Sequence, residues 1–486
     1  MAVTLYTSRV VLNILGVENY GIYTLIGGLV SMFIIVSGSM TTACQRFLSY
    51  ALGKNDPEAT KEIFSASVSI HLILGAVIFI LAETVGLWFL NTRLEIAPDR
   101  LGAANWVFQC SLAAFLINLV SVPYNAVIIS HEKMKVFAYI SFLEVFLKLV
   151  IVLVLPLIMF DRLKVYSVLI LAVAVIIRLI YQIYSRRHFE ETNNLRLRVN
   201  KKVFGEMFSF AGWNFMGASS SILMTQGASV MLNLFFGVVV NAARGIAAQV
   251  ENAVMSFSYN FMTAITPQIT KSYASGDWNY MWKLVERGAR FCFYLVFLLS
   301  LPILFETETI LTIWLKTVPD YAVVFVQLSL IAALFQTFSF TLSTAILATG
   351  RVKYYQISTG TVQFLYLPVA YVFLKAGSSP VIVYILAIVI ALVVMIARLI
   401  VLKKEIGISI SDFLKRVFFR ALLVAAAATV IPLVLKLTLE KSLISEICIF
   451  AVALLSALGS IYLLGFTKPE KRLLAKSVSK LVNRKR

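Results

Sequence analysis

The sequence is poor in charged residues, cysteine and histidine. Only 14% of its 486 residues are charged, and 24 of them are Asp or Glu, whereas about a quarter of a soluble domain is charged. The four cysteines stand singly in apolar runs and are expected to be buried packing residues. The three histidines lie far apart, and neither GxxxxGK[ST] nor HExxH occurs. The sequence therefore predicts no metal site, no cofactor and no ATP hydrolysis by this chain.

The sequence is instead rich in apolar residues. They account for 60% of the chain, and the mean hydropathy is +0.88, which no soluble surface could accommodate. Because open strands cannot satisfy their backbone in lipid, we expect an all-α polytopic membrane protein with about 14 transmembrane helices of roughly 20 residues or more. No separate soluble domain fits between them. The predicted spans are 1–16, 20–44, 63–90, 103–130, 137–160, 163–186, 203–236, 239–266, 287–312, 321–349, 354–376, 379–402, 413–438 and 443–466.

The net charge of +19 is mostly explained by membrane topology. With the N-terminus in the cytoplasm, 29 of the 43 Lys and Arg residues fall on the inner side and nine on the outer side. The positive-inside rule then places both termini in the cytoplasm, and it leaves no reason to expect a nucleic-acid partner. The basic end of the chain, 467–486, could lie on anionic membrane lipids or act only as a topological anchor.

The first predicted span is short. Sixteen residues of helix reach only about 24 Å, which is less than the hydrocarbon core. We expect either that Met1 is an internal methionine of a longer frame or that the first helix is short and tilted.

Two segments of the chain resemble each other. LNILG at 12–16 followed by ACQRFLSYALGKND at 43–56 is repeated as LNLFFG at 232–237 followed by TPQITKSYASGDWN at 266–279, with offsets of 220 to 223 residues. Six spans separate the copies, so spans 1–6 and 7–12 would form two parallel lobes with two helices appended, a plan in which transporters bind substrate between the lobes. The predicted parts are an N-lobe 1–186, a linker 187–202, a C-lobe 203–402, spans 13–14 at 403–466 and the tail 467–486.

Some basic residues are not explained by topology. A charge inside a span is costly and usually faces a cavity or a partner, and an Arg fork binds phosphate oxygens. Arg398 and Arg420 lie near inner helix ends, where their charged groups can reach the membrane surface. Arg46 could be a topological charge, and Arg244 could reach the outer surface. The candidates for binding an anionic substrate are Arg9, Arg46, Arg244, Lys148 and Arg178.

Acidic residues inside spans are the candidates for coupling to an ion gradient. Glu144 lies four residues before Lys148, so the two can pair on one helix face. The pair could serve only to permit insertion, or it could open and let Glu144 take a proton. Glu83 is a second candidate, and Glu251 lies seven residues after Arg244 on the same face.

Polar uncharged residues indicate a path for a hydroxyl-rich substrate. Asn118 and Asn125 lie seven residues apart in one predicted span, and Trp213 and Asn214 are adjacent in another. Amide and indole groups suit sugar hydroxyls and ring faces. The alternative is hydrogen bonding between helices, which is common in membrane bundles.

Several stretches resemble one known superfamily. LYTSRVVLNILGVENYGIY, QRFLSYALGKND, HEKMKVFAYISFLE, FAGWNFMG and NAARGIAAQVENAV are similar to the multidrug/oligosaccharidyl-lipid/polysaccharide (MOP) flippase superfamily, and within it to bacterial Wzx-type polysaccharide flippases. The resemblance implies two MATE-like lobes around a cavity that opens alternately to each side. It implies a secondary transporter that moves a polyprenyl-pyrophosphate-linked oligosaccharide from the cytoplasmic to the periplasmic leaflet of the inner membrane, for lipopolysaccharide or other surface polysaccharide. Arg9, Arg46 and Arg244 stand where that family places cavity arginines, and a proton or sodium gradient stays open as the energy source.

Two other functions remain to be separated from this one. A multidrug cation antiporter of the same fold would favour an acidic cavity, whereas the charges inside the spans are mostly basic. A membrane polymerase or ligase would need a large outer loop, and the longest outer connection spans roughly 15 residues.

Overall fold

The computed structural model describes residues 2–31, 33–92, 96–193, 200–315, 318–440 and 442–472. Parts of the predicted linker 187–202 and tail 467–486 lie outside these residues, and so does the side chain of Arg9. The chain divides into two compact units, Met1–Ala218 with Thr270–Gly276, and Ser219–Ile269 with Asp277–Arg486. Each unit is described by itself, and the lobe boundaries expected from the sequence stay predictions.

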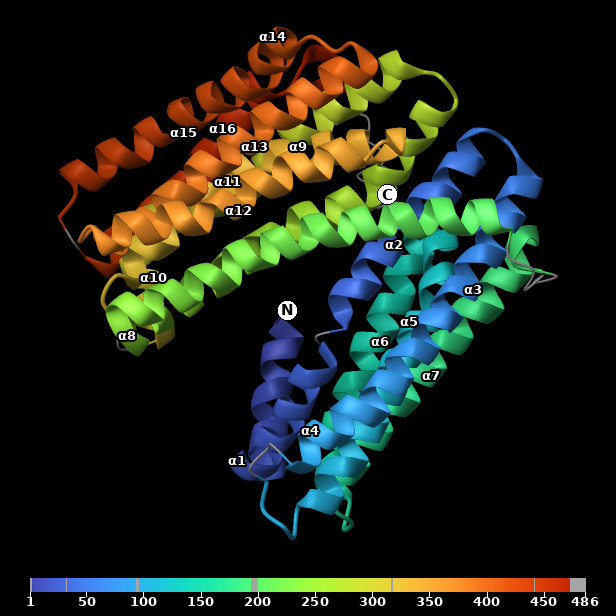
Figure 1. The fold of residues 1–486 in the computed structure, drawn as a ribbon. Coiled ribbons are helices and arrows are strands. Elements are labelled where there is room, and N and C mark those ends of the chain that lie inside the picture. Colours follow the sequence, from blue (N-terminus) through green and yellow to red (C-terminus); the bar gives the residue numbers. More distant parts are fainter. Residues whose placement is uncertain are drawn as a thin grey trace, which may run out of the picture. The chain divides into compact units, whose positions relative to one another are not determined.

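Unit 1 is a helical bundle centred on one long helix, α5. In Figure 1, α5 and α7 run side by side, and α5 also packs against α1, α2 and α3. The buried ring of Tyr124 in α5 meets Phe64 edge-on, with a centroid distance of 5.2 Å. The elements are α1 (Ala2–Ser31), α2 (Ile34–Gly53), α3 (Pro57–Leu81), η1 (Ala82–Gly86), α4 (Leu87–Thr92), α5 (Leu101–Ser130), α6 (Met134–Val154), η2 (Leu155–Leu157), α7 (Arg162–His188), η3 (Glu190–Thr192) and both ends of α8 (Lys201–Ala274).

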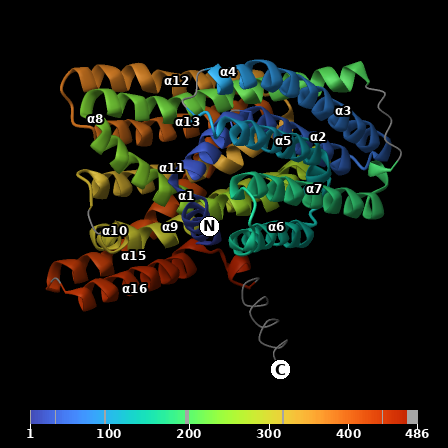
Figure 2. The same cartoon turned by 90° about the horizontal axis from the view of Figure 1, so that it is seen from below.

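Unit 2 is built around α9 and α11. Helix α11 packs between α9 and α13, and α9 also contacts α15 and α16, which lie together in Figure 2. The elements are the central part of α8, α9 (Trp278–Phe305), α10 (Thr307–Leu315), α11 (Ala322–Thr349), α12 (Lys353–Lys375), α13 (Ile382–Ile406), α14 (Ile410–Phe413), η4 (Leu414–Phe418), α15 (Phe419–Thr438), α16 (Leu443–Ser460) and η5 (Ile461–Gly465).

The all-α polytopic fold class is confirmed. Among the described residues, ten helices are long and apolar enough to cross a membrane, and they coincide with predicted spans 3–6 and 9–14. The other four predicted spans fall in α1, α2 and α8, and the 74 residues of α8 are long enough for two of them. One smaller expectation was wrong, because Cys448 is exposed. It lies on α16, whose apolar side chains are mostly uncovered and suited to lipid contact.

The two sequence repeats share an unusual backbone feature. Gly16 breaks α1 with a φ of 78°, and Gly237 breaks α8 with a φ of 79°. Each is the last residue of an LN…G element, and glycine adopts this left-handed region without a Cβ clash. The same conformation at corresponding places supports an internal repeat.

The third helix of each copy also begins in the same way. Asn55, with a φ of 53°, precedes Asp56, which accepts a hydrogen bond from the Ala59 amide and caps α3. Gly276, with a φ of 82°, precedes Asp277, which caps α9 through the Tyr280 amide. A left-handed residue followed by a capping Asp therefore opens both helices.

Candidate functional site

Arg244 is the best-defined basic residue of unit 2. Its Nε donates to the Ser229 hydroxyl at 2.8 Å, and its Nη2 donates to the Thr225 backbone oxygen. Both acceptors lie on the segment of α8 that precedes the break at Gly237, so the side chain bridges the two parts of this helix. The guanidinium is half-buried and thus combines a fixed orientation with remaining access.

Two tyrosines and one carboxylate interact electrostatically with this guanidinium. Glu251 is the acidic residue that interacts electrostatically with Arg244, but the two do not form a direct ion pair. Tyr384 of α13 and Tyr366 of α12 are buried beside it, and the Tyr366 hydroxyl donates to the Val383 oxygen at 3.0 Å. Three helices of unit 2 therefore place hydroxyls, a carboxylate and a guanidinium together. We call these residues the Arg244 cluster: Arg244, Glu251, Tyr366 and Tyr384.

Ser258, which shares the helix face of Arg244 and Glu251 in the sequence, has a different role. It is fully buried and donates to the backbone oxygen of Cys292 at 3.0 Å, so it joins α8 to α9.

In unit 1, Glu144 and Lys148 form the ion pair that their spacing allows. Their oxygen and nitrogen are 2.6 Å apart, and both side chains are more than one-third exposed. Tyr181 of α7 is buried next to Glu144, and its hydroxyl interacts with Ser141 and Asn125. Glu144 and Asn125, both predicted from the sequence, therefore interact with one buried tyrosine, and Lys148 is paired to Glu144.

Two other basic residues of unit 1 lie against aromatic rings. The Arg178 guanidinium is 4.1 Å from the ring centroid of Tyr124. The Arg46 guanidinium lies 4.6 Å from the centroid of Phe47 and 4.8 Å from that of Tyr50. Contacts of this kind help to hold a guanidinium in place.

Glu83 lies in the short π-helix η1. Its Oε2 accepts from Gln109 Nε2 at 3.2 Å, while its Oε1 is buried without a hydrogen bond. A π-helical turn holds about one residue more than an α-helical turn, so the residues of α4 are rotated relative to those before η1. As a result, Glu83 and Asn91 both contact α5. Asn91 there exchanges hydrogen bonds with Asn105 at 3.0 and 3.2 Å.

The remaining candidates are more dispersed. Asn118 is exposed on α5, Trp213 is half-buried and Asn214 is buried in α8, in unit 1. Arg9 lies in α1, but its side chain is outside the described part. Among the described residues, no three His, Cys, Asp or Glu side chains are placed to hold a metal ion.

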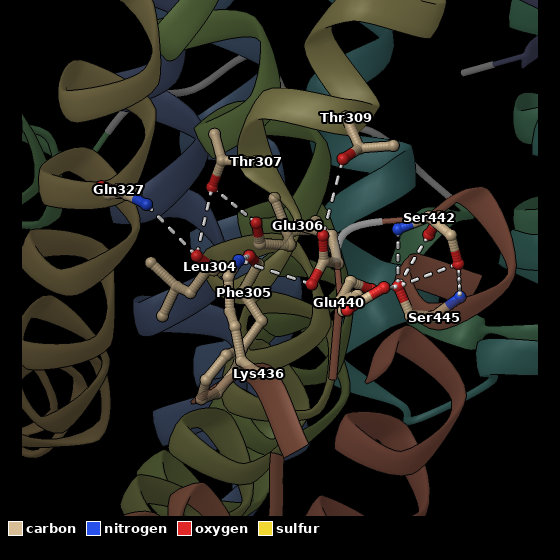
Figure 3. Close-up of polar contacts among 11 residues, drawn as sticks. Leu304, Phe305, Glu306, Thr307, Thr309, Gln327, Lys436, Glu440, Ser442 and Ser445 are labelled. Carbon is tan, nitrogen blue, oxygen red and sulfur yellow. Dashed lines mark hydrogen bonds and ion pairs between the residues drawn. The ribbon is translucent and has the colours of Figure 1, made fainter. Parts of the chain in front are cut away.

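Two ion pairs that the sequence did not reveal join the last helices to α9. Near the middle of α9, Arg290 Nη2 lies 2.6 Å from Glu470 Oε1, and the side chains are only 7% and 5% exposed. At the C-terminal end of α9, Lys436 Nζ lies 3.4 Å from Glu306 Oε1 and also donates to the Phe305 oxygen (Figure 3). The only sequence signal for the first pair was a single acidic residue in a basic segment.

A further polar contact lies outside the spans. His131 Nε2 is 2.5 Å from Glu191 Oε1, and the His131 ring stacks on Phe189 at 4.3 Å. Burial would raise the pKa of the Glu191 carboxyl, but the hydrogen bond and charge of His131 outweigh burial and hold this pKa below its ordinary value of 4.5. A folded-state pKa below the unfolded one means that the pair stabilises the fold above about pH 4.5, and this is lost as the pH falls through the lowered pKa.

We therefore expect Glu191→Gln to lower the apparent free energy of unfolding at neutral pH by about 1.5–3 kcal/mol, the contribution of a charged hydrogen bond. The difference from the unmodified protein should shrink below about pH 4.5, because protonation then removes the same charge. Thermal unfolding in detergent over a pH series measures both effects. Glu190→Gln, at the exposed neighbouring residue, is the control, and an equal loss in both variants would contradict the assignment.

Solved structures define the class of protein. The fold is similar to an outward-facing multidrug resistance transporter of the MATE family within the MOP superfamily, with a TM-score of 0.71, 13% identity, and coverage of 84% of this chain and 92% of that one. A MATE protein in its straight conformation has a TM-score of 0.72 and 13% identity, and the match covers 84% of this chain and 92% of that one. A third similar structure is a MOP transporter from Pyrococcus furiosus, described as having a binding pocket of reverse polarity that suggests a different function. Its TM-score is 0.67 at 13% identity, and the match covers 85% of this chain and 92% of that one. The chain thus has the fold of MOP-superfamily transporters.

The particular family follows from the sequence. Residues 3–273 match the polysaccharide biosynthesis protein family, and the chain belongs to this family. No curated protein matches the chain significantly. The resemblance to MOP flippases is confirmed, and the protein is a multi-pass membrane protein with a transporter fold.

Proposed function

We propose that the protein is a flippase for a polyprenyl-pyrophosphate-linked oligosaccharide, which it moves from the cytoplasmic to the periplasmic leaflet of the bacterial inner membrane by alternating access. The family description, polysaccharide biosynthesis, and the transporter fold support this proposal. In the proposed orientation both termini are cytoplasmic, as the distribution of Lys and Arg predicts.

The observation that carries the proposal is the Arg244 cluster. Arg244 lies seven residues beyond Gly237, which is about 10 Å along the helix. Ser229 and Thr225 hold the guanidinium at this distance from the helix break, and its paired N–H groups can bind phosphate oxygens. Glu251 balances part of its charge when no anion is bound, and an arriving pyrophosphate would compete with that carboxylate.

The other basic candidates would act on the same anionic group or along its path. Aromatic rings lie against Arg46 and Arg178, and Lys148 could exchange its partner Glu144 for a phosphate. Arg9 is assigned from the sequence alone. Asn118, Asn125, Trp213 and Asn214 are proposed to contact the sugars, and Asn125 has the buried hydroxyl of Tyr181 as a neighbour.

The proposal is tested by expression in a bacterial strain that lacks its own flippase and makes the matching lipid-linked repeat unit. The chain should restore surface polysaccharide and remove the lipid-linked precursor that accumulates on the cytoplasmic side. A failure to do either at normal membrane levels would contradict the proposal.

A multidrug cation antiporter is the second candidate, and the similarity to multidrug MATE transporters favours it. Such a protein would use Glu83 or Glu251 to bind a cation. In the same strain, resistance to cationic dyes without a change in precursor would support the antiporter and exclude the flippase.

Glu144 is the leading candidate for proton coupling because it can release Lys148 and take a proton. We expect Glu144→Gln to slow export by about 10- to 150-fold, equivalent to losing one charged contact of about 1.5–3 kcal/mol, and to abolish its dependence on external pH. Transport in vesicles across a pH series measures both. Glu308→Gln, at an exposed residue of α10, is the control, and a normal pH response in Glu144→Gln would exclude this role.

A further inference from the structure

Unit 2 contains an apolar cavity beside its last membrane helix. The cavity lies among α8, α9, α16 and η5, and its volume is about 710 Å³. Its walls are aromatic and aliphatic, with Phe261 from α8, Phe291 and Leu298 from α9, and Leu458 and Tyr462 from the last helix. Leu458 in α16 and Tyr462 in η5 are about half exposed, so the cavity opens to the surface of unit 2 beside α16.

Charged residues mark one end of this cavity. Arg287 and Glu470 both line it, and Arg287 Nε lies 3.6 Å from Glu470 Oε1. Glu470 is already neutralised by the closer and buried Arg290. Lys471 follows Glu470, and its Nζ lies 5.2 Å from the ring centroid of Tyr462. We call this charged end of the cavity its mouth. The mouth is net positive, and an anion can reach Lys471 and the exposed part of Arg287.

The position of the cavity limits what can fill it. The walls offer almost no hydrogen-bond partners, so ordered water is disfavoured, and a buried water needs two to four such partners. Helices α9 and α16 are membrane spans by length and composition, so an opening on α16 meets lipid chains. In the proposed orientation the charged mouth faces the inner leaflet, where anionic lipids give a negative surface potential.

The size of the cavity also selects its occupant. With a volume of about 710 Å³ and almost wholly apolar walls, the cavity has room for an apolar chain rather than for a single small molecule. An acyl chain of a membrane phospholipid is the apolar chain that the surrounding bilayer supplies. We propose that this cavity binds one acyl chain of an anionic phospholipid whose head group contacts Arg287 and Lys471.

The head group must supply the selectivity of this site. Lipid tails are as apolar as the cavity walls, so moving a chain from the bilayer into the cavity has no hydrophobic driving force. One basic residue near an anionic head group contributes about fivefold in affinity, whereas the chain contributes only packing. The site should therefore distinguish lipids by charge and be nearly indifferent to acyl-chain identity.

The test is native mass spectrometry of the full chain in detergent, with phosphatidylglycerol and phosphatidylcholine of identical acyl chains as probes. The unmodified protein should retain one phosphatidylglycerol about 25-fold more strongly than phosphatidylcholine, with about fivefold from each of Arg287 and Lys471. Leu458→Trp fills the cavity and should remove the bound lipid. Arg287→Gln should retain the lipid with the preference reduced to about fivefold, because Lys471 remains, and it leaves the buried Arg290–Glu470 pair intact.

Two matched variants control for general effects on lipid binding. Leu455→Trp places the same ring on the exposed face of α16, and Lys404→Gln removes an exposed charge from α13. Both should bind as the unmodified protein does. The proposal is wrong if Leu458→Trp and Leu455→Trp retain equal amounts of lipid, if the two lipids bind equally to the unmodified protein, or if a polyprenyl phosphate displaces phosphatidylglycerol from the cavity. None of these outcomes depends on what the protein transports.

Discussion

Replacing Arg244 with alanine is expected to reduce surface polysaccharide strongly while the protein stays in the membrane at its normal level. The substitution removes the guanidinium that Ser229 and Thr225 orient inside the span. A charged hydrogen bond to an anionic group contributes about 1.5–3 kcal/mol, which corresponds to about a 10- to 150-fold slower export. The lipid-linked precursor should accumulate on the cytoplasmic side, and thin-layer separation of labelled lipids measures it.

Two further variants separate the geometry of Arg244 from its charge. Arg244→Lys keeps the charge but loses the two-pronged donor, so its export should lie between those of the unmodified protein and Arg244→Ala. Arg420→Ala is the control, because Arg420 is also basic and bonds only to the backbone oxygens of Leu464 and Phe466 at a helix end. Normal export by Arg244→Ala at normal membrane levels would remove Arg244 from the proposed binding group.

The helices were predictable because each span depends mainly on local composition. A run of about 20 apolar residues must be helical in lipid, whatever it packs against. Sequence similarity likewise paired Gly16 with Gly237, and both glycines break their helices. The exact boundaries were less predictable. The π-helix η1, for example, interrupts a predicted span, and no local pattern predicted it.

Contacts between side chains were predictable only where they were local. Glu144 and Lys148 are four residues apart on one helix, and their ion pair follows from helix geometry. Arg290 and Glu470 are 180 residues apart, and the sequence analysis counted Arg290 only as a topological charge at the inner side. The Arg244 cluster lies between these cases, since Glu251 follows from spacing but Tyr366 and Tyr384 require the packing of α12 and α13.

The buried pair between Arg290 and Glu470 should have the largest effect on stability. Removing one member leaves the other charge buried without its partner, which costs about 3–5 kcal/mol. Glu470→Gln is the sharpest variant because its amide oxygen can still accept from the Thr467 amide, as Glu470 Oε2 does at 2.7 Å. We expect a marked fall in thermal unfolding temperature in detergent, whereas Glu440→Gln, at an exposed residue, should have no effect.

The double variant Arg290→Met with Glu470→Gln tests the cause of that fall. With both charges gone, no uncompensated buried charge remains, because Arg287, the other partner of Glu470, is partly exposed, and much of the stability should return. A double variant that is as unstable as the sum of the two single variants would show that packing of residues 467–472, rather than charge pairing, holds this end of unit 2.

The second ion pair on α9 extends this argument to the whole C-terminal pair of helices. Glu306 and Arg290 lie 16 residues apart, about 24 Å along the helix, so their contributions should add if each pair acts locally. Glu306→Gln combined with Glu470→Gln should then destabilise by the sum of the two single effects. If instead the combination is no worse than one variant alone, α15 and α16 detach from α9 as one unit once either pair is broken. The lipid proposed to fill the cavity should be lost in that state, because α9 and α16 both line it.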